Sequence, residues 1–375
     1  MKIPITKPYI GKEEKKAICD VLDSGWLVQG AKVAEFEKMI CMYTGAKYAV
    51  ASTSCTTSLH LALEALGIGK GDEVIVPSFT FIASANAIEY TGAKPVFVDI
   101  DLDTYNINVE GIRRAITSKT KAIMPVHLFG LCADMNEIMM IAKKYGLFVV
   151  EDAACAWGSM IGTQHAGTFG DISSFSLHPR KPITTGEGGM AITNNPGLAT
   201  KMRSLRDHGA AVSDLARHDK GDSILPAYEM RGYNFRMTDI QGAMGVEQMK
   251  KLPWIIQKRI EKAEIYNKEL RDIDWLKVPW KPNNHKHTYQ SYVVLVAGNE
   301  LRNKVMVDLA DKGISTRQGT HAVHALSYYK KKYHFTDSDL NCSFTADQLT
   351  MTIPLYPQMT SLEQEYVIDA IRRIK

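Results

Sequence analysis

The chain has 375 residues, of which 45% are hydrophobic and 23% charged, and its formal net charge is +4. These values are typical of a globular protein with one large and one smaller domain. The charge is spread along the chain, which argues against nucleic acid as the main partner. The sequence contains no run of about 18 apolar residues, so a membrane span is not expected.

Short apolar runs in the first half of the chain have the length of buried strands. They lie at Lys47–Ser52, Glu73–Pro77, Pro95–Ile100, Ala122–His127, Leu147–Asp152 and Ile172–Leu177. Helical patterns separate them; in one, Asp134 is the expected N-cap, Glu137 lies three residues on and Gly146 ends the pattern. This alternation predicts an α/β fold with a mostly parallel central sheet flanked by helices.

The alternation of strand and helix patterns ends at Thr238. Residues 239–272 have a helical pattern that we expect to be bent or broken at Pro253. A connection rich in Pro and Lys follows at 277–287, and the remainder predicts two or three strands with two or three helices. We therefore expect a large domain over residues 1–250, including the N-terminal segment, and a smaller C-terminal α/β domain over residues 251–375.

The cysteine pattern and the N-terminal residues indicate the cellular compartment in which we expect the protein. Six cysteines are scattered along the chain and none forms a CxxC pair, so we expect a reducing environment rather than a disulfide framework. The N-terminus lacks the apolar core of a signal peptide. A cytoplasmic protein is the expectation.

Four strand ends carry residues that are unusual there, and open α/β sheets bind ligands at these ends. Hydroxyl residues 52–58 run from a strand into a helix and suit an anion, although a helix cap with nothing bound is the commoner case. Phe81 either covers a flat ring or is core. Glu151 and Asp152 either face a ligand or reach solvent. Lys181, between prolines and before a glycine-rich return, is either held rigidly for chemistry or solvated.

The functional alternatives together describe one ligand. It has a phosphate for the hydroxyl-rich helix start, a flat ring for Phe81, a basic ring nitrogen for Asp152 and an aldehyde for Lys181. Pyridoxal 5′-phosphate has these four features and acts as an electron sink. A lysine forms the Schiff base with such a cofactor, so Lys181 is the predicted catalytic residue.

The order of motifs resembles the DegT/StrS family of sugar aminotransferases, which are fold-type I pyridoxal-phosphate enzymes. The resemblance covers nearly the whole chain. Its segments are Ser24–Gly30, Pro77–Phe81, Glu151–Ala154, Ser176–Gly189, Gly232–Thr238 and Pro354–Thr360. The segment around Lys181 is the most specific.

The resemblance implies roles for individual residues. Lys181 would form the Schiff base and move the proton, Asp152 would pair with the ring nitrogen and Phe81 would stack on the ring. The phosphate would be held by Thr56, the backbone at Cys55, Ser176 and, from the neighbouring subunit of a homodimer with shared active sites, Asn234. An ordinary turn residue is the alternative for Asn234.

Two positions bear on the match with the family pattern. Where the family often has Gln or His near the ring hydroxyl, this chain has Cys155, a weak donor, so either another group covers that oxygen or the site tolerates a weaker contact from Cys155. A relative that removes a sugar hydroxyl has His in place of the lysine, so Lys181 favours transamination.

The remaining candidates belong to the substrate pocket. They are Trp26, His178, Arg180, Arg317 and His321. The arginine at 317 and the histidines at 321 and 324 would face a diphosphate or lie on the surface. The two histidines also have the spacing of ligands on one helical face, but no third ligand is in view and no metal is expected.

The predicted activity is transfer of an amino group from glutamate or glutamine to a nucleotide-linked keto-sugar, most simply a 4-keto-6-deoxyhexose. The alternatives are amination of a keto-cyclitol, dehydration of a sugar, or a non-catalytic sensor that binds pyridoxal phosphate or a sugar nucleotide. The identity of the sugar, of its nucleotide and of the aminated ring position depends on the shape of the pocket.

Overall fold

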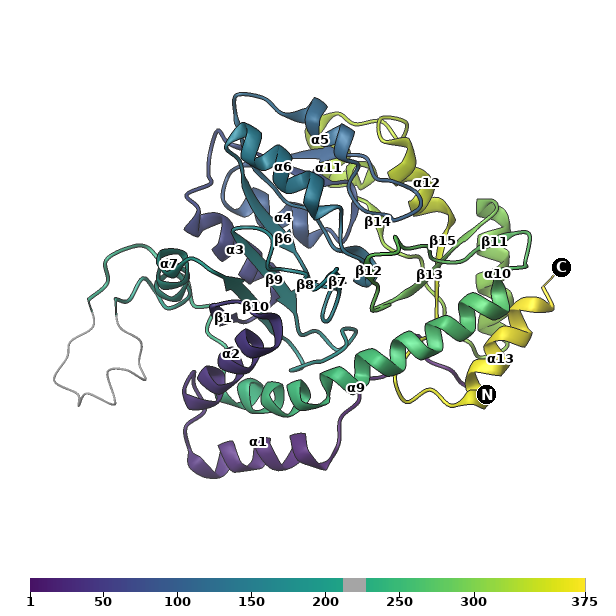
Figure 1. Ribbon diagram of the computed structural model, residues 1–375, viewed down its shortest axis with the longest axis horizontal. Coiled ribbons are helices and arrows are strands. Elements are labelled where there is room, and N and C mark those ends of the chain that lie inside the picture. Colours follow the sequence, from purple (N-terminus) through teal and green to yellow (C-terminus); the bar gives the residue numbers. More distant parts are fainter. Residues whose placement is uncertain (212–226, 375) are drawn as a thin grey trace.

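The computed structural model describes residues 1–211 and 227–374. A central sheet with helices on both faces forms the larger part, and a smaller group of strands and helices lies beside it (Figure 1). The long helix α9 (Asp239–Leu270) runs from the first part to the second. This is the expected α/β architecture.

The central sheet has seven strands in the order β1-β10-β9-β6-β5-β2-β4. Their bounds are β1 Tyr48–Ser52, β2 Glu73–Pro77, β4 Lys94–Val98, β5 Thr120–Ile123, β6 Phe148–Asp152, β9 Ile172–Ser176 and β10 Gly189–Thr193. Pairings from β9 to β4 are parallel, whereas β10 is antiparallel to both neighbours. The six predicted strands are confirmed, and β10 was not predicted because it lies in the glycine-rich return.

One predicted strand is shorter than expected. The run at 122–127 continues as apolar sequence, but β5 ends at Ile123. Pro125 follows, and a proline cannot donate a ladder hydrogen bond. The backbone beyond it leaves the sheet and makes only an isolated bridge between Val126 and Asp152.

Alternating residues of the strands fill two separate apolar layers. Ile75 and Val149 belong to one buried cluster, and their neighbours Val74, Val76 and Val150 belong to another. Successive side chains of a strand point to opposite faces, so both faces of the sheet are covered. This explains why the strands read as continuous apolar runs.

Helices cover the two faces and the edge of this sheet, except α1, which packs outside on α9. They are α1 Lys12–Ser24, α2 Ala31–Thr44, α3 Cys55–Ala65, α4 Ala83–Tyr90, α5 Val109–Ala115, α6 Met135–Tyr145 and α7 Pro196–Arg206. In α6 the Asp134 side chain accepts from the Glu137 N–H, and Gly146 ends the helix in the left-handed region at φ 65°, as the sequence predicts. Short strands β3 Phe79–Thr80, β7 Met160–Ile161 and β8 Gln164–His165 complete this part.

Helix α9 is continuous through Pro253, so the predicted break is absent. It packs beside α1 and α2 at its start, and farther along Ala263, Tyr266 and Leu270 enter the C-terminal apolar cluster. Ile3 joins the same C-terminal cluster. The division of the chain at residue 250 stays a prediction.

The C-terminal part contains one helix more than expected. Its helices are α10 Asn299–Asp311, α11 Ser327–Tyr333, α12 Asn341–Leu349 and α13 Ser361–Arg372, and its strands are β11 Leu276–Lys277, β12 His285–Lys286, β13 Tyr292–Val296, β14 His321–Ala322 and β15 Thr350–Ile353. Strand β14 pairs with β3 of the larger part, which places the C-terminal segment beside the strand ends of interest.

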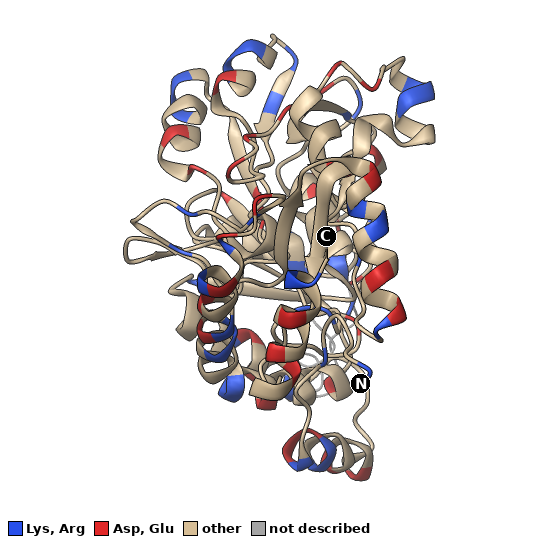
Figure 2. Cartoon of the chain, turned by 90° about the vertical axis from the view of Figure 1, so that its right-hand side faces the viewer, with Lys and Arg blue, Asp and Glu red and all other residues tan. Residues whose placement is uncertain are grey.

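Charged residues of both signs alternate over the outer helices (Figure 2). In the described part of the chain, no helix combines the length and the apolar character needed to cross a membrane.

Candidate active site

Lys181 lies in the loop between β9 and β10. The base of this loop is fixed, because the Leu177 N–H donates to the Gly188 carbonyl and the Thr185 N–H donates to the Leu177 carbonyl, each at 3.0 Å. The Lys181 ammonium donates to the Cys155 sulfur at 3.0 Å, and a thiol sulfur is a weak acceptor. Among the described residues the amine has no carboxylate partner.

Asp152 ends β6 and is buried, with 5% of its surface exposed. The Ser84 hydroxyl donates to its Oδ2 at 2.7 Å, and the Ala154 N–H donates to its Oδ1 at 3.1 Å. No cationic side chain in residues 1–211 or 227–374 forms an ion pair with it. A buried carboxylate without a cation is costly, so a protonated ligand group fits this place.

The start of α3 offers donors to an anion. Ser54 is the N-cap, and its hydroxyl accepts from the Thr57 N–H. Within the part of the chain that is described, no group accepts a hydrogen bond from the N–H of Cys55 or Thr56. A Cβ on Gly189 of β10 would collide with the backbone of Ser54 and Cys55, so the helix start lies directly against that glycine.

The electrostatics of Cys55 show that these groups lie together. Burial raises the pKa of the Cys55 thiol well above its usual value, the charge of Asp152 adds to the rise and the charge of Lys181 opposes it. Cys155 acts on the same thiol. The structure therefore brings Lys181, Asp152, Cys55 and Cys155 into one site, as the sequence predicts.

Three further predicted cofactor residues come from other parts of the chain. Phe81 precedes α4 and is 64% exposed, so the alternative that it is core is wrong. Ser176 ends β9 and is buried, and its hydroxyl accepts from the His178 N–H at 3.4 Å. Asn234 is exposed and its backbone bridges to Asp207. Their contacts with a cofactor stay predictions.

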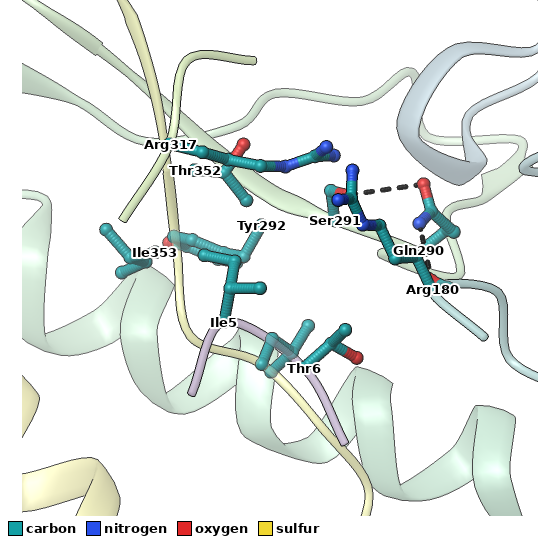
Figure 3. A pocket seen from close by; sticks show the side chains of 10 residues that line it. Ile5, Thr6, Arg180, Gln290, Ser291, Tyr292, Arg317, Thr352 and Ile353 are labelled. Atoms are coloured by element: carbon teal, nitrogen blue, oxygen red, sulfur yellow. Dashed lines mark hydrogen bonds between the residues drawn. The ribbon is translucent and has the colours of Figure 1, made fainter. Parts of the chain in front are cut away.

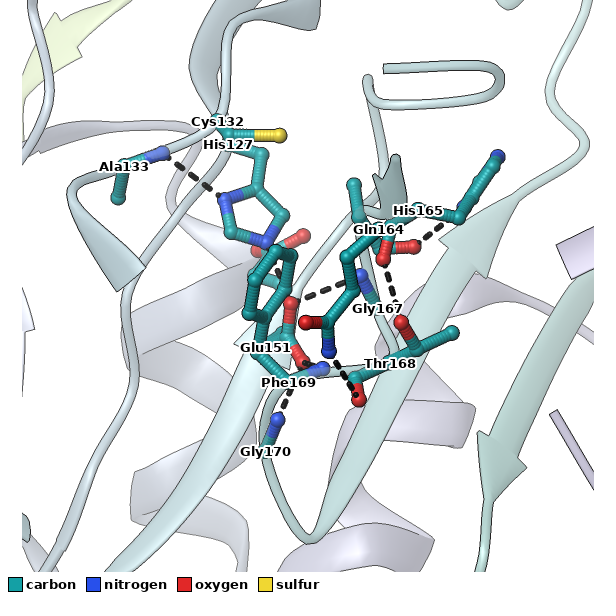
Figure 4. Close-up of polar contacts among 12 residues, drawn as sticks. His127, Cys132, Ala133, Glu151, Gln164, His165, Gly167, Thr168, Phe169 and Gly170 are labelled. Carbon is teal, nitrogen blue, oxygen red and sulfur yellow. Dashed lines mark hydrogen bonds and ion pairs between the residues drawn. The ribbon is translucent and has the colours of Figure 1, made fainter. Parts of the chain in front are cut away.

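Glu151 lies beside Asp152 but faces the opposite layer, and the alternative that both carboxylates reach solvent is wrong. Its side chain is fully buried. One oxygen accepts from the N–H groups of Phe169 (2.8 Å) and Gly170 (2.6 Å), and the other accepts from the N–H of Gly167 (2.7 Å) and from His127 Nε2 (2.7 Å) (Figure 4). Glu151 is thus a structural anchor for the end of β6.

Two arginines lie near Lys181 in a pocket between the larger part and the C-terminal part. Arg180 precedes the lysine, and Arg317 comes from the segment before β14; both guanidinium groups extend into the same region (Figure 3). Burial lowers the pKa of Arg317, and the charge of Arg180 lowers it further. Burial also lowers the pKa of His178; the charge of Glu187 opposes this effect, and the charges of Lys181, Arg180 and Arg317 add to it.

The other predicted substrate residues are spread out. His321 is exposed in β14 and pairs with Thr80, the residue that precedes Phe81 in the chain. His324 lies in a 3₁₀ turn, fully buried, with Nδ1 2.6 Å from the Ser78 hydroxyl. The two histidines therefore do not share a helical face.

Trp26 packs against Gly30 near the start of α9 and lines a different pocket from the two arginines. The described residues contain no group of three side chains suited to hold a metal ion.

Sequence reasoning missed three side chains that support the site. Ser84 donates to Asp152, His127 donates to Glu151, and the Gln290 amide donates to the Arg180 carbonyl at 2.9 Å. Each comes from another element and has no local motif around it. Only the burial of a polar residue in an apolar stretch, as at His127, gave any signal.

The side chains present fit pyridoxal phosphate. A lysine amine without an acid partner suits its aldehyde, a buried carboxylate without a cation suits its protonated ring nitrogen, and unpaired N–H groups at a helix start suit its phosphate. All three features lie within one site on the carboxyl side of the sheet.

Comparison with known proteins agrees with this chemistry. The model of the DegT/DnrJ/EryC1/StrS aminotransferase family matches residues 8–372. The spore coat polysaccharide biosynthesis protein SpsC of Bacillus subtilis (strain 168) is 39% identical over 376 residues, which is 99% of this chain and 97% of that protein. The GDP-perosamine synthase of Escherichia coli O157:H7 is 39% identical over 372 residues, covering 98% and 97%.

The fold is also that of a solved relative. The putative sugar aminotransferase Spr1654 from Streptococcus pneumoniae, in its PMP form, superposes with a TM-score of 0.93 at 29% identity, over 98% of each chain. The similarity extends across both parts of the structure.

Proposed function

Because the chain belongs to the DegT/DnrJ/EryC1/StrS aminotransferase family and is a pyridoxal-phosphate-dependent sugar aminotransferase, we propose that it transfers an amino group from glutamate or glutamine to a nucleotide-linked 4-keto-6-deoxy sugar. The observation that carries this proposal is the Lys181 amine beside the buried Asp152 and the open N–H groups of α3. The 39% identity to a GDP-perosamine synthase supports a nucleotide-linked substrate.

Bound pyridoxal phosphate supplies an aldehyde and an electron-withdrawing ring that stabilises negative charge at the substrate carbon. Asp152, oriented by Ser84, holds a positive charge at the ring nitrogen. The N–H groups of Cys55 and Thr56 hold the phosphate. Lys181 Nζ would take a proton from the α-carbon of the amino donor and deliver it to the carbon of the cofactor's former aldehyde group, and the weak acceptor Cys155 leaves this amine free to move.

The proposal includes a homodimer with shared active sites. Asn234 is exposed, which supports contact with a group outside its own chain. In the proposed dimer its amide reaches the phosphate in the site of the neighbouring subunit.

The test is Lys181→Ala, with Lys121→Ala on the exposed side of β5 as the matched control. Both variants are incubated with pyridoxal phosphate, glutamate and a panel of nucleotide-linked keto-sugars, and aminated products are detected by mass spectrometry. We expect Lys181→Ala to lose the Schiff-base absorbance band and all amination, and the control to retain both. Amination by Lys181→Ala at the rate of the control would refute the assignment.

A further inference from the structure

The guanidinium groups of Arg180 and Arg317 form a pair of like charges without a counter-charge. No ion pair and no side-chain hydrogen bond joins either guanidinium to another residue in the described ranges. Arg180 is exposed and Arg317 is half-buried. Both extend toward one region in Figure 3, where the Ser291 hydroxyl and the Gln290 amide lie close by.

Backbone contacts hold the pair in place. The Arg317 N–H donates to the Thr352 carbonyl at 3.3 Å, and the Thr352 N–H donates back to the Arg317 carbonyl at 2.7 Å. Gln290 Nε2 donates to the Arg180 carbonyl at 2.9 Å. The two arginines are therefore presented by fixed backbone from the lysine loop and from the C-terminal part.

The pair also lies next to the reacting amine. Arg180 is the residue before Lys181, and Lys181, Arg180 and Arg317 all act on the pKa of His178. Cys155, whose sulfur contacts Lys181 Nζ, acts on the pKa of Arg317. An anion that bridges the guanidinium groups is thus held partly from the lysine loop, by the residue that precedes Lys181.

We propose that Arg180 and Arg317 bind the α-carboxylate of the amino donor, an inference that rests on the proposed function. Two like charges facing each other repel, and burial adds to the cost, so an anion between them is favoured. A guanidinium binds a carboxylate through two parallel hydrogen bonds. In an amino acid that carboxylate is attached to the carbon that bears the reacting nitrogen, which matches the closeness of the pair to Lys181.

The diphosphate of the sugar substrate fits this place less well. In a nucleotide-linked 4-keto sugar the diphosphate and the reacting carbon lie on opposite sides of the sugar ring. When the keto carbon is placed at Lys181, the diphosphate therefore lies a ring width away. The arginine pair beside Lys181 is too close to the lysine to bind it. We therefore assign the arginine pair to the first half-reaction, in which it binds the amino acid, rather than to the second half-reaction with the sugar.

The test compares L-glutamate with 4-aminobutyrate, which is the same molecule without the α-carboxylate. The cofactor-bound enzyme is mixed with each amine, and the second-order rate constant of the absorbance change gives a selectivity ratio. Calorimetric binding of glutarate, an unreactive dicarboxylate, gives a readout without turnover. The variants are Arg317→Met, Arg317→Lys and Arg180→Met, and the control is Arg373→Met on the exposed end of α13.

A hydrogen-bonded charge pair predicts a roughly 10- to 100-fold loss of reaction with glutamate and of glutarate affinity in Arg317→Met. The rate with 4-aminobutyrate stays unchanged, so the selectivity ratio falls by the same factor. Arg317→Lys lies between, since it keeps the charge and loses the planar fork. Arg180→Met follows Arg317→Met, and Arg373→Met matches the native enzyme.

Equal losses with both amines, or a defect confined to the reaction with the keto-sugar, would overturn the carboxylate assignment while leaving the proposed function intact. If the native enzyme gives no absorbance change with any amino acid, the proposed function fails and the inference fails with it. The two failures are distinguished by the native enzyme alone.

Discussion

Replacing Glu151 by glutamine should strongly destabilise the protein, although the two side chains have nearly the same shape. The carboxylate oxygens each accept two hydrogen bonds, at 2.6 and 2.8 Å on one oxygen and 2.7 and 2.7 Å on the other. His127 Nδ1 accepts from the Ala133 N–H at 3.1 Å, so His127 Nε2 carries the proton and all four groups around Glu151 are donors.

The magnitude follows from counting these donors. An amide has one oxygen and one NH₂ group, so in either orientation of the substituted side chain the NH₂ faces two N–H donors. At least two hydrogen bonds to a charged group are lost, and each is worth about 1.5–3 kcal/mol. The expected loss in the free energy of unfolding is therefore roughly 3–6 kcal/mol, a large share of the stability of an ordinary domain.

The assay is urea unfolding of the native protein, Glu151→Gln and the control Glu365→Gln, followed by circular dichroism and fluorescence. Glu365 is exposed on α13, so its substitution should change the free energy of unfolding by no more than about 0.5 kcal/mol. His127→Phe removes one of the four donors and should fall between the two. A loss under about 1 kcal/mol in Glu151→Gln, similar to the control, would refute the hydrogen-bond accounting.

Two further predictions concern the site and the response to acid. Ser84→Ala removes the hydroxyl that donates to Asp152 at 2.7 Å; we expect about tenfold weaker binding of pyridoxal phosphate, measured by absorbance titration, and an unchanged affinity would contradict it. Burial lowers the pKa of His165 from 6.5 to about 4, and its Nε2 accepts from the Gly158 N–H at 3.0 Å. Because the unfolded chain takes up the proton first, this contribution to stability is complete above pH 6.5 and is lost as the pH falls toward 4. It amounts to about 3 kcal/mol, so urea unfolding of His165→Gln should depend less on pH over that range, and equal slopes would contradict the prediction.

The sequence predicted the elements that depend on local pattern. The buried parallel strands were found because both faces of the sheet are covered and the runs are continuously apolar. The cap of α6 was found because Asp134 and Gly146 act on their own backbone. Strand β10 was missed because its register is set by its neighbours β1 and β9, and a glycine-rich stretch carries no strand signal of its own.

The same distinction separates the parts of the site. Lys181 and Asp152 were predicted because motifs surround them at strand ends. Ser84 and the pairing of Arg317 with Arg180 depend on which distant elements meet, which no local pattern records. The helix is not broken at Pro253 for the converse reason: α9 packs on α1 and α2 and stays continuous despite the cost of the proline.

The structure also suggests a physical role for Cys155, which the family resemblance left open. Its sulfur accepts a hydrogen bond from Lys181 Nζ at 3.0 Å, so Cys155, which follows the Glu-Asp-Ala-Ala segment, contacts the lysine directly. A carboxylate at this position would hold the amine in its charged, unreactive form through a strong ion pair. A neutral, weak acceptor orients the amine without that penalty. In the proposed mechanism the fixed negative charge of the site therefore lies at Asp152, which would face the ring nitrogen, and not beside the lysine amine.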